Sequence, residues 1–238
     1  MASQNPTVGH MSTHILSLLS AHRSSYTSPP PLFVAIQGPQ GSGKTYLTSG
    51  LKDVLASQPH NLNVVVLSLD DLYLTHSGLK ELRDANPGNR LLAGRGLPGT
   101  HDIPLGSLIL TILKSINSPQ LKSSSSVYLP IFEKSLNGGE GDRLSPSEWV
   151  QVHGPVDVFV MEGWCMGFSS ISFKELRAVW EGSAVGENMR SWCRIEDIKA
   201  VNERLREYER FWEMFDAFIQ VSFFIYFVSP TPANKANR

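Results

Sequence analysis

The sequence predicts an α/β protein with a mainly parallel sheet that helices cover on both faces. Two short apolar runs, 32–37 and 62–69, flank a helical segment at 44–57. Strand, helix and strand in this order make a βαβ unit, whose crossover is right-handed and whose strands are parallel. A third strongly apolar run, 156–161, is followed at once by an acidic residue. Continuous apolar runs of this kind are typical of strands buried on both faces.

The overall composition is that of a folded protein. Hydrophobic residues make up 41% of the 238 residues and charged residues 18%, which excludes charge-driven disorder for most of the chain. The formal net charge of −1 gives no electrostatic footprint for nucleic acid or an anionic membrane. Two cysteines cannot make a disulfide framework, and we find no signal peptide or membrane-spanning stretch. We expect a soluble, cytoplasmic protein with one main domain.

The remaining elements follow from apolar spacing and from breakers. Apolar residues at helical spacing predict a first helix over 9–22, which the run SSYTSPPP ends because proline lacks an amide donor. A glycine- and proline-rich loop spans 84–100, and Asp102 is an N-cap before Pro104. We predict further helices over 71–83, 104–117 and 196–215, and further strands over 127–132 and 217–221. We expect three regions: a helix and proline-rich linker over 1–30, the main domain over 31–221, and an atypical tail over 222–238.

The strongest motif is GPQGSGKT at 38–45, a full G-x-x-x-x-G-K-[ST] match between a predicted strand and a predicted helix. Its glycines let successive backbone amides turn inward and hold phosphate at the positive end of the helix. Lys44 neutralises phosphate oxygens, and the Thr45 hydroxyl is a ligand for Mg²⁺. The motif predicts a P-loop NTPase fold in three layers, in which the nucleotide-binding residues are Gly38, Gly41, Ser42, Gly43, Lys44 and Thr45.

Acidic residues follow two of the predicted apolar strands. Asp70 and Asp71 come after the strand at 62–69, and Glu162 comes after the strand at 156–161. In open α/β sheets ligands bind at the carboxyl ends of the strands, so these carboxylates are expected to face the phosphates. One carboxylate can deprotonate an acceptor hydroxyl, and others can support the metal. The structural alternative is that Asp70 or Asp71 only caps the next helix, and many buried strands simply end in an acid.

Basic residues in the glycine-rich loops complete the candidate set. Phosphoryl transfer and an anionic acceptor both need cations nearby, although a loop arginine is as often only solvated. His101 next to Asp102 is either a substrate-binding pair or a helix cap with a neighbour. Aromatic residues of the helix at 196–215 are expected in the core, and Cys165 is expected to be structural. The basic candidates are Arg90, Arg95, His101, Lys134 and Arg143.

Taken together, the strings GPQGSGKT, LSLDDLY, NRLLAGRGLPGTHD, LPIFEKSLNGGEGDR and VFVMEGW resemble the D-glycerate 3-kinase-like branch of P-loop kinases. The pattern is more distantly similar to uridine kinase, phosphoribulokinase and bacterial pantothenate kinase. The resemblance implies a five-stranded parallel core, ATP with Mg²⁺ as the phosphoryl donor, and a small hydroxylated acceptor. The basic loop residues favour an acceptor that is anionic. It covers the chain from about residue 14 to about residue 221.

The resemblance also assigns roles by matching residues. It implies Asp70 as the catalytic base, with Lys44 and Arg143 also catalytic, and Thr45, Asp70 and Glu162 on the metal side. It implies an acceptor pocket lined by Asp71, Arg95, His101, Asp102 and Lys134. One departure is Glu133, which stands where the family has aspartate in a D-K-S string.

The resemblance stops before the C-terminal tail. Family members continue into an arginine-containing lid helix, whereas this chain reads SFFIYFVSPTPANKANR. We expect the lid region to be missing, and we hypothesise that the tail is read-through of a retained intron or an error in the gene model.

Two functions stay open on this basis. The first is an ATP-dependent kinase of a small acceptor, with glycerate the first to try. The second is a truncated pseudokinase that binds ATP but is catalytically impaired. A GTPase is poorly supported because no strand ends in the N-K-x-D signature.

Overall fold

The structure is a computed structural model, and it describes residues 5–119, 126–222 and 226–228. Its centre is a sheet in the order β2–β7–β1–β8–β9. The first four strands are parallel, and β9 pairs with β8 in the antiparallel direction. The expected α/β fold is confirmed, but with four parallel strands instead of the five that the family resemblance implies. The strands are β1 (Leu32–Gln37), β2 (Val64–Ser68), β7 (Val158–Gly163), β8 (Ala217–Gln220) and β9 (Tyr226–Val228).

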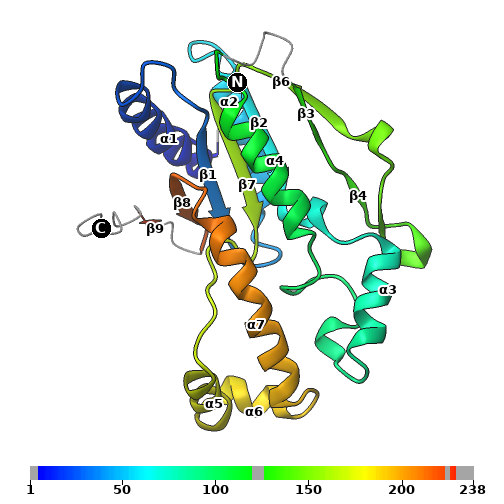
Figure 1. Cartoon of the computed structure of the whole chain (residues 1–238). Helices are drawn as coiled ribbons and strands as arrows, with labels where there is room; N and C mark the ends of the chain where they lie inside the picture. The colour runs from blue at the N-terminus through cyan, green and yellow to red at the C-terminus, as the bar shows by residue number, and fades with distance from the viewer. Residues whose placement is uncertain (1–4, 120–125, 223–225, 229–238) are drawn as a thin grey trace, which may run out of the picture.

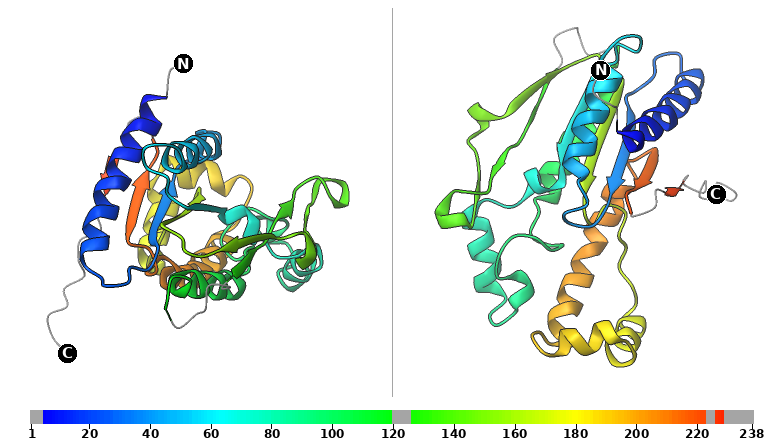
Figure 2. Two further views of the ribbon diagram at one scale, coloured as in Figure 1. Left: turned by 90° about the horizontal axis from the view of Figure 1, so that it is seen from above. Right: turned by 180° about the vertical axis from the view of Figure 1, so that it is seen from behind.

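Helices cover both faces of this sheet. Alternate residues of β1 point to opposite faces, so Phe33 and Ala35 join one apolar cluster and Val34 and Ile36 join the other. The first cluster is covered by α4 (Ile103–Ser115) and α7 (Ile195–Trp212), which lie in front of the sheet in Figure 1. The second is covered by α1 (Pro6–Ser24) and α2 (Lys44–Ala56), visible from behind in Figure 2. This is the predicted three-layer arrangement.

Two small antiparallel pairs extend from one side of the sheet. They are β3 (Ser126–Leu129) with β6 (Val150–His153), and β4 (Phe132–Glu133) with β5 (Asp142–Arg143). The predicted single strand over 127–132 is therefore wrong. It is interrupted at Pro130, which has no N–H to donate to a ladder.

The predicted helix over 71–83 is also replaced by two shorter elements. A 3-10 turn, η1 (Leu69–Leu72), follows β2 directly, and α3 (His76–Ala85) begins after it. Ser68 caps the turn and Thr75 caps α3 with side-chain oxygens, so the chain starts two helical segments instead of one. Three further 3-10 turns are η2 (Arg90–Leu92), η3 (Asn137–Gly139) and η4 (Pro146–Glu148).

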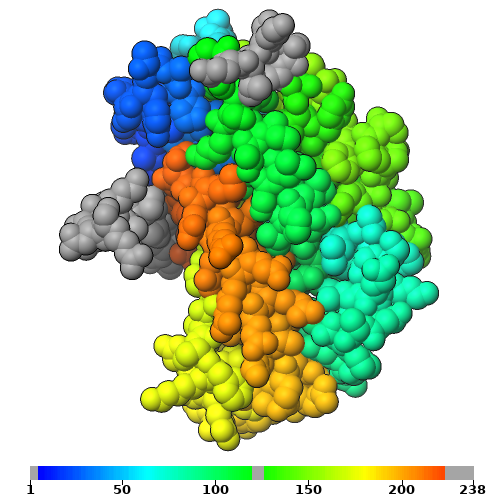
Figure 3. Space-filling view, viewed as in Figure 1, coloured from blue at the N-terminus to red at the C-terminus, as the bar shows by residue number. Residues whose placement is uncertain are grey.

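Two helices that the sequence analysis did not predict precede α7. They are α5 (Phe173–Gly182) and α6 (Ala184–Arg190), which project from the body at the lower end of α7 in Figure 3. The long helix itself begins as predicted but ends at Trp212, three residues before the expected end. Among the described residues, no helix combines the length and apolar character that a membrane crossing needs. Most of the predicted tail lies outside the described residues.

Candidate active site

The phosphate loop joins β1 to α2. Gly41 and Gly43 have φ angles of +76° and +78°, in the left-handed region that favours glycine, and Gly43 is the N-cap of α2. The loop is packed tightly at its start, because a Cβ at Gly38 would lie 2.9 Å from the Val221 carbonyl oxygen. The Lys44 ammonium donates a hydrogen bond to the Pro39 carbonyl oxygen at 2.9 Å. The loop therefore has the backbone geometry of an anion-binding turn at a helix N-terminus.

Strand register brings an acid next to this loop. Glu162 of β7 pairs with Ile36 of β1 on one side and with Ser68 of β2 on the other. Its carboxylate is buried and accepts a hydrogen bond from the Thr45 hydroxyl at 3.2 Å. Two of the three residues predicted for the metal side of the site, Thr45 and Glu162, are thus in direct contact.

Asp70 reaches the same place from β2. The Asp70 amide donates to the Ser68 hydroxyl at 3.3 Å, which fixes the turn that follows the strand. Its carboxylate accepts a hydrogen bond from the Lys134 ammonium at 2.7 Å, and the Lys134 side chain is 56% exposed. Asp70 and Lys134 both line a cavity of about 420 Å³ with the phosphate loop. The full lining is Gln40, Gly41, Gly43, Lys44, Thr45, Asp70, Lys134, Glu162, Gly163 and Trp164.

The oxygen donors in this cavity fit Mg²⁺. That ion is held in phosphate sites by one or two carboxylates and a hydroxyl, with phosphate oxygens and waters in its other positions. Thr45 and Glu162 provide such a pair, and Asp70 adds a second carboxylate to the same cavity. No group of three or more His, Cys, Asp or Glu residues in the described part of the chain could hold a metal by itself. The donor set fits a metal whose remaining ligands are phosphate oxygens and waters.

Two predicted acceptor residues, Asp71 and Asp102, and the predicted catalytic residue Arg143 are bound to protein groups instead. The Asp71 carboxylate accepts a hydrogen bond from the Phe132 amide at 3.1 Å, and burial raises the pKa of this carboxyl. The Asp102 carboxylate accepts from the Arg143 guanidinium at 2.9 Å and, as the N-cap of α4, from the Leu105 amide at 3.0 Å. Arg143 also donates to the Tyr73 carbonyl oxygen at 2.8 Å.

Arg95 lies outside the phosphate-loop cavity. Its guanidinium donates to the carbonyl oxygens of Gly139 and Glu140, and it lines a separate hollow of about 320 Å³ together with Lys80 and Arg83. Arg90 is the N-terminal residue of η2 and borders another shallow hollow beside α6 and α7. The structure therefore does not bring these two arginines to Asp70.

His101 is buried and lies beneath the site. Only 4% of the residue is exposed, and burial lowers the pKa of its imidazole to about 3, so the ring is neutral. Its Nδ1 is 2.7 Å from the Tyr208 hydroxyl, and its ring stacks on that of Tyr73. From the sequence we expect the aromatic residues of the long helix only in the core, and we predict no role for Tyr73. The one available signal was the string LSLDDLY, which ends at Tyr73.

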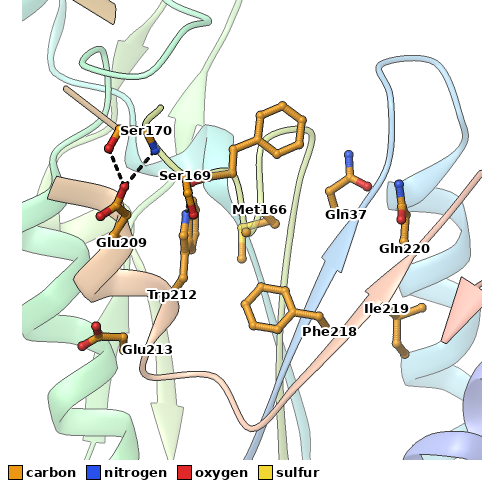
Figure 4. A pocket seen from close by; sticks show the side chains of 12 residues that line it. Gln37, Met166, Ser169, Ser170, Glu209, Trp212, Glu213, Phe218, Ile219 and Gln220 are labelled. Carbon is orange, nitrogen blue, oxygen red and sulfur yellow. Dashed lines mark hydrogen bonds between the residues drawn. The ribbon is translucent and has the colours of Figure 1, made fainter. Parts of the chain in front are cut away.

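A larger cavity of about 790 Å³ lies beside the phosphate loop and contains none of the predicted site residues. Figure 4 shows Met166 and Phe218 between Trp212 on one side and Gln37 on the other. Glu209 on its rim accepts hydrogen bonds from the hydroxyl and the amide of Ser170. Its lining mixes apolar and polar residues and includes the carboxylates Glu209 and Glu213, but it contains no lysine or arginine.

A parallel sheet with a phosphate loop after β1, an acid at the end of the adjacent strand β7 and another after β2, the next strand along, is that of the class of P-loop kinases. No family model matches the chain. The structure is similar to that of D-glycerate 3-kinase from Cryptococcus neoformans var. grubii, with a TM-score of 0.80 and 39% identity. That likeness covers 91% of this chain and 73% of the other. The chain belongs to the family of D-glycerate 3-kinase and related ATP-dependent kinases, and the resemblance found in the sequence is confirmed.

Two curated relatives agree with this assignment. The chloroplastic D-glycerate 3-kinase of Arabidopsis thaliana is 34% identical over 193 residues, which are 81% of this chain and 38% of the relative. A probable ATP-dependent kinase of Saccharomyces cerevisiae is 38% identical over 142 residues, which are 59% of this chain and 48% of the relative. The chain spans between 38% and 64% of the length of the curated relatives that it matches.

Proposed function

We propose that this protein is an ATP-dependent kinase that transfers the γ-phosphoryl group to a hydroxyl of a small acceptor, with D-glycerate the first candidate. The observation that carries the proposal is the cavity in which Asp70 and Lys134 face Thr45 and Glu162 of the phosphate site. A phosphate cradle and an acceptor-side carboxylate within one cavity suit direct in-line transfer. The names of the two relatives that are D-glycerate 3-kinases support the choice of acceptor.

The proposed chemistry assigns one task to each side of the cavity. Mg²⁺ bound with ATP supplies charge neutralisation on the phosphates, and Thr45 and Glu162 would hold it. Lys44 exchanges its hydrogen bond to the Pro39 carbonyl for the phosphate oxygens. Asp70 takes the proton of the acceptor hydroxyl, whose oxygen forms a bond to the γ-phosphorus while the bond from that phosphorus to the β-phosphate oxygen breaks. ADP leaves with that electron pair.

Lys134 suits an acceptor that carries negative charge. Its ammonium lies 2.7 Å from Asp70 and is more than half exposed, so it can contact a small anion without losing its place beside the base. Arg143 is less available, because its side chain is only 10% exposed and is paired with Asp102. We infer that Lys134 is the main acceptor-side cation and that Arg143 holds the loop in place.

The two free cysteines are consistent with the proposed cytoplasmic location.

The test is a coupled ADP-release assay against D-glycerate and a panel of other hydroxy acids, sugars and nucleosides. We expect ADP formation to depend on an acceptor and on Mg²⁺. Asp70→Asn should lower kcat by on the order of 10² to 10⁴ with nucleotide binding retained, because a general base contributes that much. Asp84→Asn is the matched control, since its carboxylate is exposed on α3.

Three results would contradict the proposal. The first is ADP formation that needs no acceptor, and the second is full activity in Asp70→Asn. The third is tight ATP binding without turnover against every acceptor of the panel, which would favour the pseudokinase alternative.

A further inference from the structure

We propose that the hollow beside α3 is a second anion site, separate from the phosphate loop, that takes a phosphate dianion, either free or as part of a small phosphomonoester. The hollow has a volume of about 320 Å³, and no residue that lines it also lines the phosphate-loop cavity. In Figure 1 it lies where α3 meets the turn between β4 and β5. Three segments contribute its polar and glycine lining: Lys80 and Arg83 of α3, Gly94 and Arg95 of the loop after η2, and Gly139 and Glu140 of the turn at 137–141.

The hollow has an excess of positive charge. Lys80, Arg83 and Arg95 line it together with a single carboxylate, that of Glu140, in a chain whose formal net charge is −1. This carboxylate is shared, because it also lies 3.0 Å from Nε2 of His76. Arg83 makes ion pairs only at N–O distances of 3.9 Å, and Lys80 has no hydrogen-bond or ion-pair partner among the described residues. The cations are therefore only weakly neutralised by the protein itself.

The Arg95 guanidinium is already fixed at the edge of this hollow. Its Nη1 donates to the carbonyl oxygen of Gly139 at 2.7 Å and to that of Glu140, and its central carbon lies 5.7 Å from the centre of the Phe132 ring. A guanidinium has five N–H donors, and those on Nε and Nη2 have no acceptor within the described part of the chain. A fixed guanidinium with unused donors in a fork suits two-point recognition of phosphate oxygens.

The backbone around the hollow leaves both space and donors for an anion. A Cβ at Gly94 or at Gly139 would meet no atom within 4 Å, so both glycines border open space. The amides of Gly94 and Arg95 donate no hydrogen bond to any residue that the structure describes. Unpaired backbone amides beside cations are a common feature of anion sites in proteins.

The charge balance indicates which anion suits the hollow. Its lining has an excess of two positive charges, which matches a phosphate group with a charge of about −1.5 to −2 at neutral pH. A hydroxy acid such as glycerate has a single negative charge and matches it less well. The phosphorylated hydroxy acid that the proposed reaction makes is one source of such a group, and inorganic phosphate is the other. The inference goes beyond the proposed function, because phosphate binding needs no turnover.

The test measures the binding of inorganic phosphate to the full chain by isothermal titration calorimetry. It uses Lys44→Ala to weaken the phosphate loop, and we expect this variant to keep a phosphate site. Replacing both α3 cations in that background, by Lys80→Gln and Arg83→Gln, should weaken phosphate binding at least about tenfold, because two charged donors are lost. Lys174→Gln, at an exposed lysine of α5, is the matched control and should leave the affinity unchanged.

A second arm of the titration distinguishes the two sources of phosphate. It repeats the measurement with 3-phosphoglycerate in place of inorganic phosphate. Tighter binding of 3-phosphoglycerate assigns the site to a phosphomonoester, and equal or weaker binding assigns it to free phosphate. In both cases the affinity should depend on Lys80 and Arg83.

Hydrogen exchange with and without phosphate locates the bound anion. We expect exchange in the Lys44→Ala chain to slow at 93–95 and 137–141, and to stay unchanged there once Lys80 and Arg83 are also replaced. Three results would overturn the inference: loss of all phosphate binding in Lys44→Ala, phosphate binding that does not depend on the α3 cations, or D-glycerate bound there as tightly as phosphate. A kinase assay that fails with every acceptor contradicts the proposed function alone, because none of these measurements uses turnover.

Discussion

Replacing Asp102 should destabilise the fold through two separable interactions. One carboxylate oxygen caps α4 by accepting from the Leu105 amide, and the other pairs with Arg143. Asp102→Ala removes both interactions, whereas Asp102→Asn keeps an oxygen for the cap and loses the ion pair. The two variants therefore measure the cap and the ion pair independently.

The structure sets the magnitude of each loss. A lost N-cap costs about 1 kcal/mol. The Arg143 side chain is 10% exposed and that of Asp102 is 26% exposed, so solvent screens their pair only weakly. A hydrogen bond to a charged group contributes about 1.5–3 kcal/mol, and Arg143 would retain only the Tyr73 carbonyl. We expect the free energy of unfolding to fall by about 1.5–3 kcal/mol in Asp102→Asn and by about 2.5–4 kcal/mol in Asp102→Ala.

Urea unfolding at pH 7, followed by far-UV circular dichroism, measures both values. A thermal scan should show the melting temperature lower by about 2–4 °C for each kcal/mol lost. If both variants unfold within about 0.5 kcal/mol of the wild type, the ion pair is not a stabilising contact. If Asn and Ala are equally destabilised, the cap contributes nothing. Either outcome would refute the reasoning, and the first would favour a direct role of Asp102 toward the acceptor.

Two further predictions concern stability. Gly106→Ala should lower the free energy of unfolding by about 1–3 kcal/mol, because its Cβ would lie 2.8 Å from Leu72 and 2.9 Å from Phe211. Gly9→Ala, in a part of α1 with open space around it, should raise the free energy of unfolding by about 0.5–1 kcal/mol. Urea unfolding of the two variants and the wild type measures both changes, and a Gly106→Ala variant as stable as the wild type would contradict the tight packing. The depressed pKa of His101, about 3 against an ordinary 6.5, contributes stability that is present above pH 6.5 and is lost as the pH falls through 3. When the pH is lowered from 6 to 5, the free energy of unfolding of the wild type should fall by roughly 1 kcal/mol more than that of His101→Asn. Urea titrations at the two pH values measure this, and equal losses in both proteins would contradict the explanation.

The centre of the site could be predicted because its signals are local. The phosphate loop is one short string, and Asp70 and Glu162 each follow an apolar strand directly. Parallel strands place their carboxyl ends at one edge of a sheet, so finding the strands was enough to bring these residues together. The structure agrees, with Glu162 paired between Ile36 and Ser68.

The buried contacts behind the site, such as that of His101 with Tyr208, could not be predicted, because the partners are distant in the chain. His101 and Tyr208 are 107 residues apart, and an aromatic residue at helical spacing looks the same whether it only fills the core or also makes a hydrogen bond. For the cations in the loops, the sequence could not show which of them reach the site. Arg95 and Lys134 look alike in the sequence, yet the turn at 137–141 holds the Arg95 guanidinium on its carbonyl oxygens while Lys134 reaches Asp70.

The contact between Thr45 and Glu162 joins residues 117 positions apart in the chain. Because such long-range pairing forms late and slowly, an early folding intermediate with β1 and α2 in place would have a phosphate loop but no acid beside it. Nucleotide affinity should therefore report on completed folding. A nucleotide that binds only the finished sheet stabilises it by about 2.7 kcal/mol at a concentration of a hundred times Kd. In a cell, the supply of nucleotide would then help to decide how many newly made chains reach and keep the native state.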